Sequence, residues 1–243
     1  MSGTILITGA SSGIGRATAE LFISKGWMVG VLARRAAALA EIATRHDNVV
    51  VLPADVTDPD AVEKAFERFV ETAGRIDVLF NNAGTFGIAG MIDEIPVETW
   101  TEVVNVNLHG MFLCARQAFR HMRRQAPQGG RIINNGSISA YVPREGSVCY
   151  TTTKHAITGL TRTLSLDGRP YDIACGQIDI GNARTPMVEE LSARAREAGK
   201  PVPETMDVAH AAEAVLQMAA LPLSANVQFM TIMATKMPYI GRG

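Results

Sequence analysis

Seven short runs of β-branched and apolar residues alternate along the chain with longer segments in which apolar residues recur at helical spacing. The runs are too continuously apolar for strands with one face in water, and they suit parallel strands covered on both faces. We expect strands at residues 4–8, 28–33, 49–53, 76–81, 131–135, 172–180 and 227–233. This alternation predicts an α/β fold with a doubly wound, mainly parallel, seven-stranded sheet and helices on both faces.

Capping residues mark the ends of several expected helices. Asp58 and Pro59 supply an N-cap and a first helical position. Gly26 and Gly74 follow the last apolar positions of their helices, where a left-handed residue commonly ends a helix. A last helix is expected near residues 207–220, before the final strand.

Length and composition bound the class of protein. The chain has 243 residues, near the upper limit for one core, and no linker, repeat or low-complexity tract, so we expect a single domain over residues 1–243. The 23 Lys+Arg against 24 Asp+Glu give a net charge of -1, which lends no support to nucleic acid or a membrane as partner. A small molecule is therefore the default ligand.

The sequence predicts a cytoplasmic protein. No apolar run approaches the roughly 20 residues that span a bilayer, and the start MSGTILITGA does not resemble a signal peptide. Cys114, Cys149 and Cys175 are odd in number and widely spaced, so we expect no disulfide framework and no metal site. Cys149 lies beside Tyr150 and is a candidate nucleophile, but a packed structural thiol is the favoured interpretation.

The first expected strand runs into TGASSGIG, residues 8–15, and then into a helix. Gly9, Gly13 and Gly15 allow a tight turn and close approach of a ligand, while the helix N-terminus offers free N–H groups to a diphosphate. The spacing is G-x-x-x-G-x-G and differs from the standard G-x-G-x-x-G. We predict a Rossmann-type dinucleotide site; the alternative is that the glycines serve only the turn and its packing.

The residues after the second expected strand bear on the choice of nicotinamide cofactor. A carboxylate about 20 residues after the glycine turn would bind the ribose 2′-hydroxyl of NAD, whereas an arginine accepts the 2′-phosphate of NADP. Ala33 and Arg34 stand there, with no carboxylate. We predict NADP(H) as the preferred cofactor, with NAD(H) as the second candidate. The alternative is that Arg34 and Arg35 only form a solvated helix start.

Five features in order along the chain resemble the classical short-chain dehydrogenases/reductases (SDRs). They are TGASSGIG, the NNAG at 81–84, Asn107, Ser137 and the Tyr150-x-x-x-Lys154 pair, and the resemblance covers essentially the whole chain. It implies that the catalytic residues are Asn107, Ser137, Tyr150 and Lys154. Together with the glycine turn, it implies a cofactor site formed by Gly9, Ser11, Ser12, Gly13, Ile14, Gly15, Arg34, Asp55, Val56, Asn82, Ala83, Gly84, Tyr150, Lys154, Gly181, Ala183 and Thr185.

The resemblance assigns individual roles around the cofactor. The Asp55 carboxylate would bind the adenine amino group and the Val56 backbone the ring, although Asp55 alone also reads as a turn former. Ser12 stands where many NADP-dependent relatives carry a second basic residue. The NNAG segment would hold backbone and ribose; the alternative is an ordinary turn.

The expected catalytic residues come from different segments. Asn107 falls on an apolar helical stripe, so its amide is either a satisfied core group or, by resemblance, the holder of a water that bridges to the lysine. The stripe consists of Trp100, Val103, Asn107, Met111, Cys114, Ala118 and Met122. Ser137 ends the fifth expected strand. Gly136 stands where relatives carry a first serine, which suggests a wider pocket, and Ser139 is a less favoured substitute for Ser137.

After the sixth expected strand, Ile180-Gly181 replaces the usual Pro-Gly of the family. By resemblance the following residues cover the nicotinamide, with Ala183 and Thr185 near its carboxamide. Residues 186–205 would then form an exposed insertion that acts as a substrate lid.

The resemblance implies reversible hydride transfer between NADP(H) and a carbonyl or alcohol substrate. Tyr150 would carry the proton, Ser137 would bind the substrate oxygen, and Lys154 would favour the phenolate of a group that otherwise ionises near pH 10. An NADP-binding sensor or scaffold without catalysis and a methyltransferase on a similar framework are the alternatives. Family members are commonly dimers or tetramers, so we expect a homo-oligomer. The apolar C-terminal stretch either adds an interface or folds onto its own core.

Overall fold

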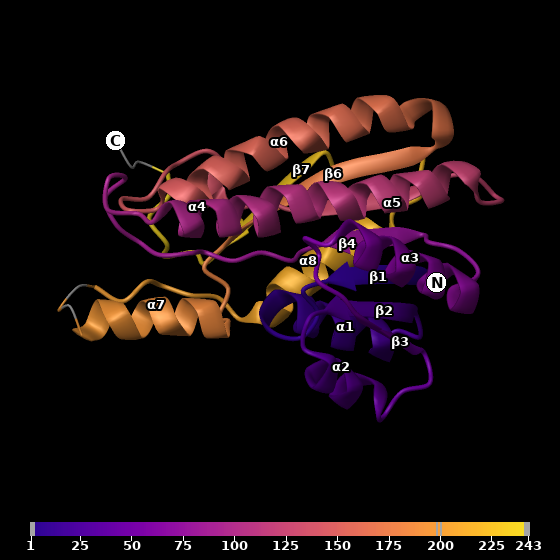
Figure 1. Cartoon of the computed structure of the whole chain (residues 1–243), viewed down its shortest axis with the longest axis horizontal. Coiled ribbons are helices and arrows are strands. Elements are labelled where there is room, and N and C mark those ends of the chain that lie inside the picture. Colours follow the sequence, from indigo (N-terminus) through magenta and orange to yellow (C-terminus); the bar gives the residue numbers. More distant parts are fainter. Residues whose placement is uncertain (1–2, 198, 200, 241–243) are drawn as a thin grey trace.

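The computed structural model describes residues 3–197, 199 and 201–240 (Figure 1). Within these residues, seven strands form one sheet in the order β3-β2-β1-β4-β5-β6-β7. Each neighbouring pair is parallel, which confirms the doubly wound prediction. The strands are β1 Thr4–Thr8, β2 Met28–Ala33, β3 Val49–Pro53, β4 Val78–Asn81, β5 Gly130–Asn135, β6 Ile173–Gly181 and β7 Phe229–Met233.

Helices cover both faces of the sheet, as expected (Figure 1). One face packs against α1, α2 and α8, and the other against α3, α5 and α6. The helices are α1 Gly13–Ser24, α2 Ala36–Ala43, α3 Pro59–Ala73, α4 Val97–Val104, α5 Gly110–Arg124, α6 Val148–Gly168, α7 Pro186–Glu197 and α8 Val208–Ala220. A π-helical turn, Asn105–His109, joins α4 to α5, so that the two run on in nearly one line.

The continuously apolar strands follow from this double coverage. In β1, Ile5 and Ile7 lie in the core beneath α1 and α8, while Leu6 lies in the core beneath α3 and α5. Successive side chains of a strand point to opposite faces, so a strand covered on both sides has no face in water. In β2, a Cβ on Gly30 would fall 2.7 Å from Cδ2 of Phe69, which shows how closely α3 approaches the sheet.

The predicted helix ends are confirmed. Oδ1 of Asp58 accepts the backbone N–H groups of Asp60 and Ala61 at 2.9 and 3.1 Å, and Pro59 takes the first helical position of α3. Gly74 ends that helix with φ 80°, and Gly26 follows α1 with φ 76°. Both are left-handed conformations that favour glycine.

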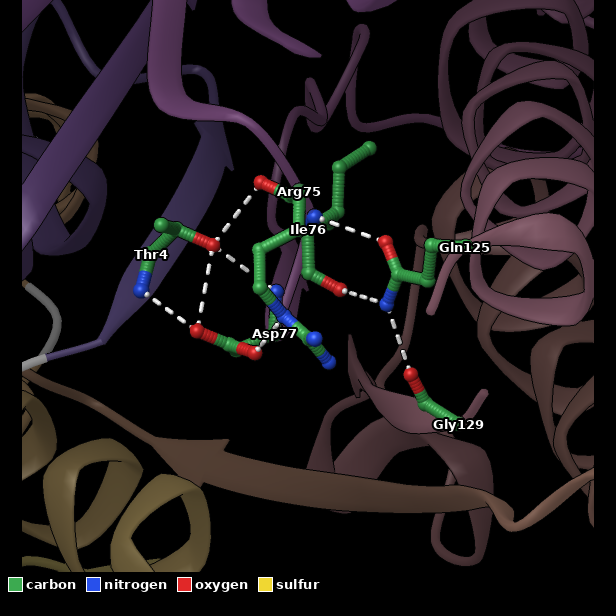
Figure 2. Close-up of polar contacts among 6 residues, drawn as sticks. All are labelled: Thr4, Arg75, Ile76, Asp77, Gln125 and Gly129. Atoms are coloured by element: carbon green, nitrogen blue, oxygen red, sulfur yellow. Dashed lines mark hydrogen bonds and ion pairs between the residues drawn. The ribbon is translucent and has the colours of Figure 1, made fainter. Parts of the chain in front are cut away.

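The start of β4 is later than predicted, at Val78 instead of residue 76. The backbone groups of Ile76 are bound by the Gln125 side chain at 2.9 and 3.0 Å, and the Asp77 N–H donates to Oγ1 of Thr4 (Figure 2). Because side chains satisfy these backbone groups, the pairing of β4 with β1 starts only after them. This polar cluster lies where β1 and β4 begin, at the opposite edge of the sheet from the strand ends that carry the predicted motifs.

The expected insertion at 186–205 forms the helix α7 over its first part. In Figure 1, α7 lies to the left of the sheet, away from the labelled N-terminus. An isolated parallel bridge between Ala183 and Met206 joins the two ends of the segment, so it leaves and returns at the same place. No helix among the described residues is long and apolar enough to cross a membrane.

The chain end folds at least in part onto its own core, one of the two alternatives considered. Ala234 and Met237 are buried with Ile138 in a small apolar cluster beyond β7. Residues 241–243 lie outside the described part of the chain.

Candidate active site

A cleft of about 380 Å³ lies at the carboxyl ends of the strands, within the usual size range of small-molecule sites. Its lining brings together most of the predicted cofactor residues. They are Gly9, Ser11, Ser12, Gly13, Ile14, Arg34, Asp55, Val56, Asn82, Ala83, Gly84, Tyr150, Lys154 and Thr185. The predicted cofactor residues Gly15, Gly181 and Ala183 lie outside this lining, and so do the predicted catalytic residues Asn107 and Ser137.

The glycine turn is shaped by close backbone contacts. Gly9 and Gly13 have φ of 68° and 56°, and a Cβ on Gly15 would lie 2.4 Å from the Gly9 carbonyl oxygen. Gly15 therefore serves strand-helix packing. This is the role that the alternative interpretation gave to all three glycines of the turn. Ser12 occupies the N-cap of α1 without capping it through its side chain. The first N–H groups of a helix have no partner within the helix, so this turn can offer them to an anion.

Thr8, at the end of β1, organises the NNAG segment; it begins the TGASSGIG motif but is not among the predicted site residues. Its Oγ1 accepts the N–H groups of Asn82 and Ala83 at 2.8 and 2.9 Å. The Asn82 amide donates to the Thr8 carbonyl at 2.9 Å and accepts from Asn135 at 2.8 Å. The Asn82 side chain thus ties β1, β4 and β5 together. The only sequence signal for Thr8 is that it lies directly before the glycine turn.

Two arginines stand beside the glycine turn. The Arg34 side chain is 71% exposed, and its Nη1 lies 3.9 Å from Oδ2 of Asp55. Arg35 donates from Nη2 to Oγ of Ser11 at 3.0 Å, so it reaches the turn as well. Its role in the site was missed because a basic residue at a helix start carries no distinguishing signal. Oδ1 of Asp55 accepts from the Thr57 N–H and hydroxyl, a turn-forming arrangement.

Asn107 lies on the π-helical turn and is fully buried. Its Oδ1 accepts the Thr85 N–H at 2.8 Å, and its Nδ2 donates to the Thr85 carbonyl and to Oγ1 of Thr153. The amide therefore joins the loop after β4 to α6, and its role in holding a water stays a prediction.

The predicted buried stripe around Asn107 is wrong at Trp100, which is 39% exposed. Trp100 lies in the first turn of α4, whereas Val103, one turn later on the same helix, is buried, so the stripe is lost only at its exposed start. The other members of the stripe are buried: Val103, Met111, Cys114, Ala118 and Met122.

Tyr150 and Lys154 lie in the first turns of α6, on the cleft side. Lys154 is only 3% exposed, and its Nζ donates to the Asn135 carbonyl at 2.7 Å. The same Nζ lies 5.4 Å from the centroid of the Tyr150 ring. The Phe86 ring packs against Tyr150 at 5.1 Å between centroids. A buried ammonium is thus held beside a phenol that faces the cleft.

Ser137 follows β5 and is buried. Its Oγ accepts the Ser139 N–H at 3.1 Å, so the hydroxyl keeps its own proton to donate to a ligand. Its backbone N–H donates to Oδ1 of Asp179 at 2.8 Å. Burial raises the pKa of the Asp179 carboxyl, and hydrogen bonds from the Gln177 side chain and the Ser137 N–H partly offset this. The sequence predictions missed Asp179, because one acid in a short strand has no pattern.

Gly136 does not widen the pocket. A Cβ there would fall 2.1 Å from Oδ1 of Asp179, so the carboxylate already occupies the space that a side chain would need.

The loop after β6 takes a defined path despite the missing proline. Asn182 has φ 43°, and the backbone on either side of Ala183 pairs with Met206. A Cβ on Gly181 would lie 2.8 Å from Cβ of Met233, so this glycine serves the packing against β7.

The three cysteines are free and buried. Burial raises the pKa of the Cys114 and Cys175 thiols to about 12. Cys149 is packed in the interior, in line with the structural interpretation. The described residues contain no cluster of metal ligands.

Comparisons with known proteins show the family of the chain. A family model described as short chain dehydrogenase matches residues 3–196. The 2-(R)-hydroxypropyl-CoM dehydrogenase of Xanthobacter autotrophicus is 38% identical over 196 residues, covering 78% of this chain and 78% of that protein. The 3beta-hydroxysteroid dehydrogenase of Mediterraneibacter gnavus is 33% identical over 193 residues, covering 78% and 69%.

Solved structures share the fold over nearly the whole chain. Levodione reductase superimposes with a TM-score of 0.87 at 26% identity, covering 95% of each chain. A short chain dehydrogenase from Burkholderia cenocepacia in complex with NADP has a TM-score of 0.80 at 29% identity, covering 94% of this chain and 95% of that one. The chain therefore belongs to the short-chain dehydrogenase family and is an oxidoreductase that acts on CH–OH groups with a nicotinamide cofactor.

Proposed function

We propose that this protein transfers a hydride reversibly between NADP(H) and a carbonyl or alcohol substrate, with Tyr150 as general acid/base. The observation that carries the proposal is the contact of Lys154 Nζ with the Asn135 carbonyl, which holds a buried cation 5.4 Å from the Tyr150 ring. An acid/base residue gives up and regains its proton in every turnover, and the phenol that would do so lies beside this buried cation.

The residues of the cleft fit a dinucleotide. The glycine turn and the uncapped start of α1 would take the diphosphate, and Arg34 and Arg35 would take a 2′-phosphate. The nicotinamide would supply or accept the hydride when bound. These contacts support NADP(H), and NAD(H) is the competing cofactor.

The chain's own residues divide the remaining work. Tyr150 donates its proton to the carbonyl oxygen during reduction and takes it back during oxidation. Ser137 donates a hydrogen bond to the same oxygen, where charge develops in the transition state. Lys154 keeps its ammonium beside the Tyr150 ring, and Asn107 fixes the loop after β4 against α6.

The substitution Tyr150→Phe tests this proposal. We expect turnover to fall by a factor of about 10² to 10⁴, the range for one acid/base group, while NADPH binding stays within about twofold. Tyr171→Phe is the matched control, because Tyr171 lies just beyond the far end of α6. NADPH oxidation is followed with ketones, sugars, steroids, quinones and acyl-thioester ketones.

Full turnover in Tyr150→Phe would contradict the proposal. If the unmodified chain binds the cofactor but turns over no substrate of any of these classes, the result would instead favour a sensor or scaffold without catalysis.

We also propose that the chain is a single domain, that residues 186–205 cover the bound substrate, and that the protein is a cytoplasmic homo-oligomer, a dimer or tetramer. The exposed Phe112 on α5 and Leu166 on α6 support an interface over these helices. Sedimentation of the purified protein tests the oligomeric state, and a monomer would overturn it.

A further inference from the structure

We propose that Asp179 and Gly136 together hold Ser137 in position and fix the position of Ser137 relative to α6. This inference rests on the proposed role of Ser137 in binding the substrate oxygen. Asp179 itself touches no reacting atom in this proposal, and it acts only through the serine.

The first step is the hydrogen bond between Asp179 and the Ser137 backbone. The ladder between β5 and β6 ends with the Gly136 N–H, which donates to the Ile178 carbonyl at 2.9 Å. The next buried donor, the Ser137 N–H, meets Oδ1 of Asp179 at 2.8 Å instead of a strand carbonyl. Without the carboxylate this N–H would be left unpaired inside the protein, and the backbone that carries the hydroxyl would lose its anchor.

The second step is the space at Gly136. A Cβ there would fall 2.1 Å from Oδ1 of Asp179 and 2.6 Å from Nε2 of Gln177. The φ of Gly136 lies outside the left-handed region, so glycine is required here for space and not for its backbone conformation. The Asp179 carboxylate occupies the space beside residue 136, so only glycine, which has no side chain, fits at that position.

The third step is the connection to α6. Nε2 of Gln177 donates to Oδ1 of Asp179 at 2.8 Å and to Oγ1 of Thr158 at 3.2 Å. Thr158 lies one turn beyond Lys154 on the same helix. The chain of contacts from Ser137 through Asp179 and Gln177 thus ends on the helix that carries Tyr150. A device of this kind sets the serine and the tyrosine at a fixed separation, which hydrogen bonding to one substrate oxygen requires.

The test is a double-mutant cycle with Ser137→Ala and Asp179→Ala, measured as kcat and as NADPH Kd. We expect Asp179→Ala to lower kcat about 10- to 100-fold, the loss that misplacement of a reacting group by about 1 Å causes, with NADPH Kd unchanged. In the Ser137→Ala background the same substitution should change kcat by less than about twofold, because groups that act as one unit are not additive. Asp179→Asn keeps an acceptor oxygen and should restore most of kcat.

Gly136→Ala provides a second route, since the added methyl group displaces the carboxylate without removing it. We expect the same loss of kcat, so the proposal remains testable if Asp179→Ala does not fold. The matched control is Asp77→Ala, which removes a carboxylate that accepts the Thr4 N–H at the opposite edge of the sheet (Figure 2). It should lower Tm and leave kcat unchanged.

An unchanged kcat in both Asp179→Ala and Gly136→Ala overturns the inference. An equal loss from Asp179→Ala with and without Ser137 also overturns it, because Asp179 would then act by another route. The proposed function is refuted by a different result, namely full turnover in Tyr150→Phe. An inactive Tyr150→Phe beside an active Asp179→Ala leaves the proposed function standing and removes only this inference.

Discussion

Replacement of Arg34 and Arg35 by alanine, singly, tests how the cleft selects its cofactor. Arg34 is mostly exposed, and its contact with Asp55 spans 3.9 Å. An exposed pair of this kind contributes about 0–1 kcal/mol, so Arg34 can leave it at little cost. Arg35 is already anchored on Ser11 at 3.0 Å. Both guanidinium groups are therefore available to a phosphate next to the glycine turn.

The expected magnitude follows from their exposure. A hydrogen bond to a charged group contributes about 1.5–3 kcal/mol, and screening at a site as open as Arg34 reduces this to about 1–2 kcal/mol. Since 1.4 kcal/mol is a factor of ten, each substitution should raise the NADPH Kd about 5- to 30-fold. NADH has no 2′-phosphate, so its Kd should stay within about twofold.

Nicotinamide fluorescence titrations with NADPH and NADH measure both constants for each variant, at 0.05 and 0.5 M salt. Added salt should weaken NADPH binding more than NADH binding in the unmodified protein, and this difference should shrink in the variants. Arg68→Ala, an exposed arginine on α3, is the matched control and should leave both constants unchanged. Tighter binding of NADH than NADPH by the unmodified chain, or an equal loss of both cofactors in Arg34→Ala, would refute the reasoning.

Three further predictions concern the turn, a helix cap and a buried acid. Gly15→Ala places a methyl group 2.4 Å from the Gly9 carbonyl oxygen, so it should lower stability by about 1–3 kcal/mol and weaken NADPH and NADH alike; unchanged titrations would contradict this. Asp58→Ala removes the cap of α3 and should lower the free energy of unfolding by about 1 kcal/mol in urea without affecting kcat; an unchanged urea midpoint would show that the cap contributes nothing. Burial raises the pKa of Asp179 above its ordinary 3.8, so its contribution to stability is greatest below that pH and declines as pH rises toward the native pKa. Asp179→Asn should therefore gain stability relative to the unmodified chain as pH rises above about 4, and a difference independent of pH between 4 and 7 would show that Asp179 has no such shift.

The order of the elements could be predicted because each depends on neighbours in the sequence. The first three strands have the predicted bounds. Asp58 begins α3 and Gly74 ends it, where their local backbone preferences place them. Where a distant side chain intervenes, local patterns are insufficient. The start of β4 is delayed by bonds from Gln125 and Thr4, which are remote in sequence.

The candidate site divides in the same way. The predicted residues Gly13 and Tyr150 line the cleft because parallel strands and the helices that follow them place their termini at one edge. The exposure of Trp100 was not predictable, because apolar spacing along a helix does not say whether another element covers its first turn. The contact of Arg35 with Ser11 also depends on how β2 pairs with β1.

The sequence by itself determined the class of fold, the dinucleotide turn and the pairing of Tyr150 with Lys154 on one helical face. These follow from periodicity and from spacing within single elements. Only the tertiary structure decided that the Lys154 ammonium is held by the Asn135 carbonyl and that the Asp179 carboxylate fills the space beside Gly136. The physical reason is that such contacts depend on strand register and on the depth of helix packing, which set distances between residues far apart in the chain.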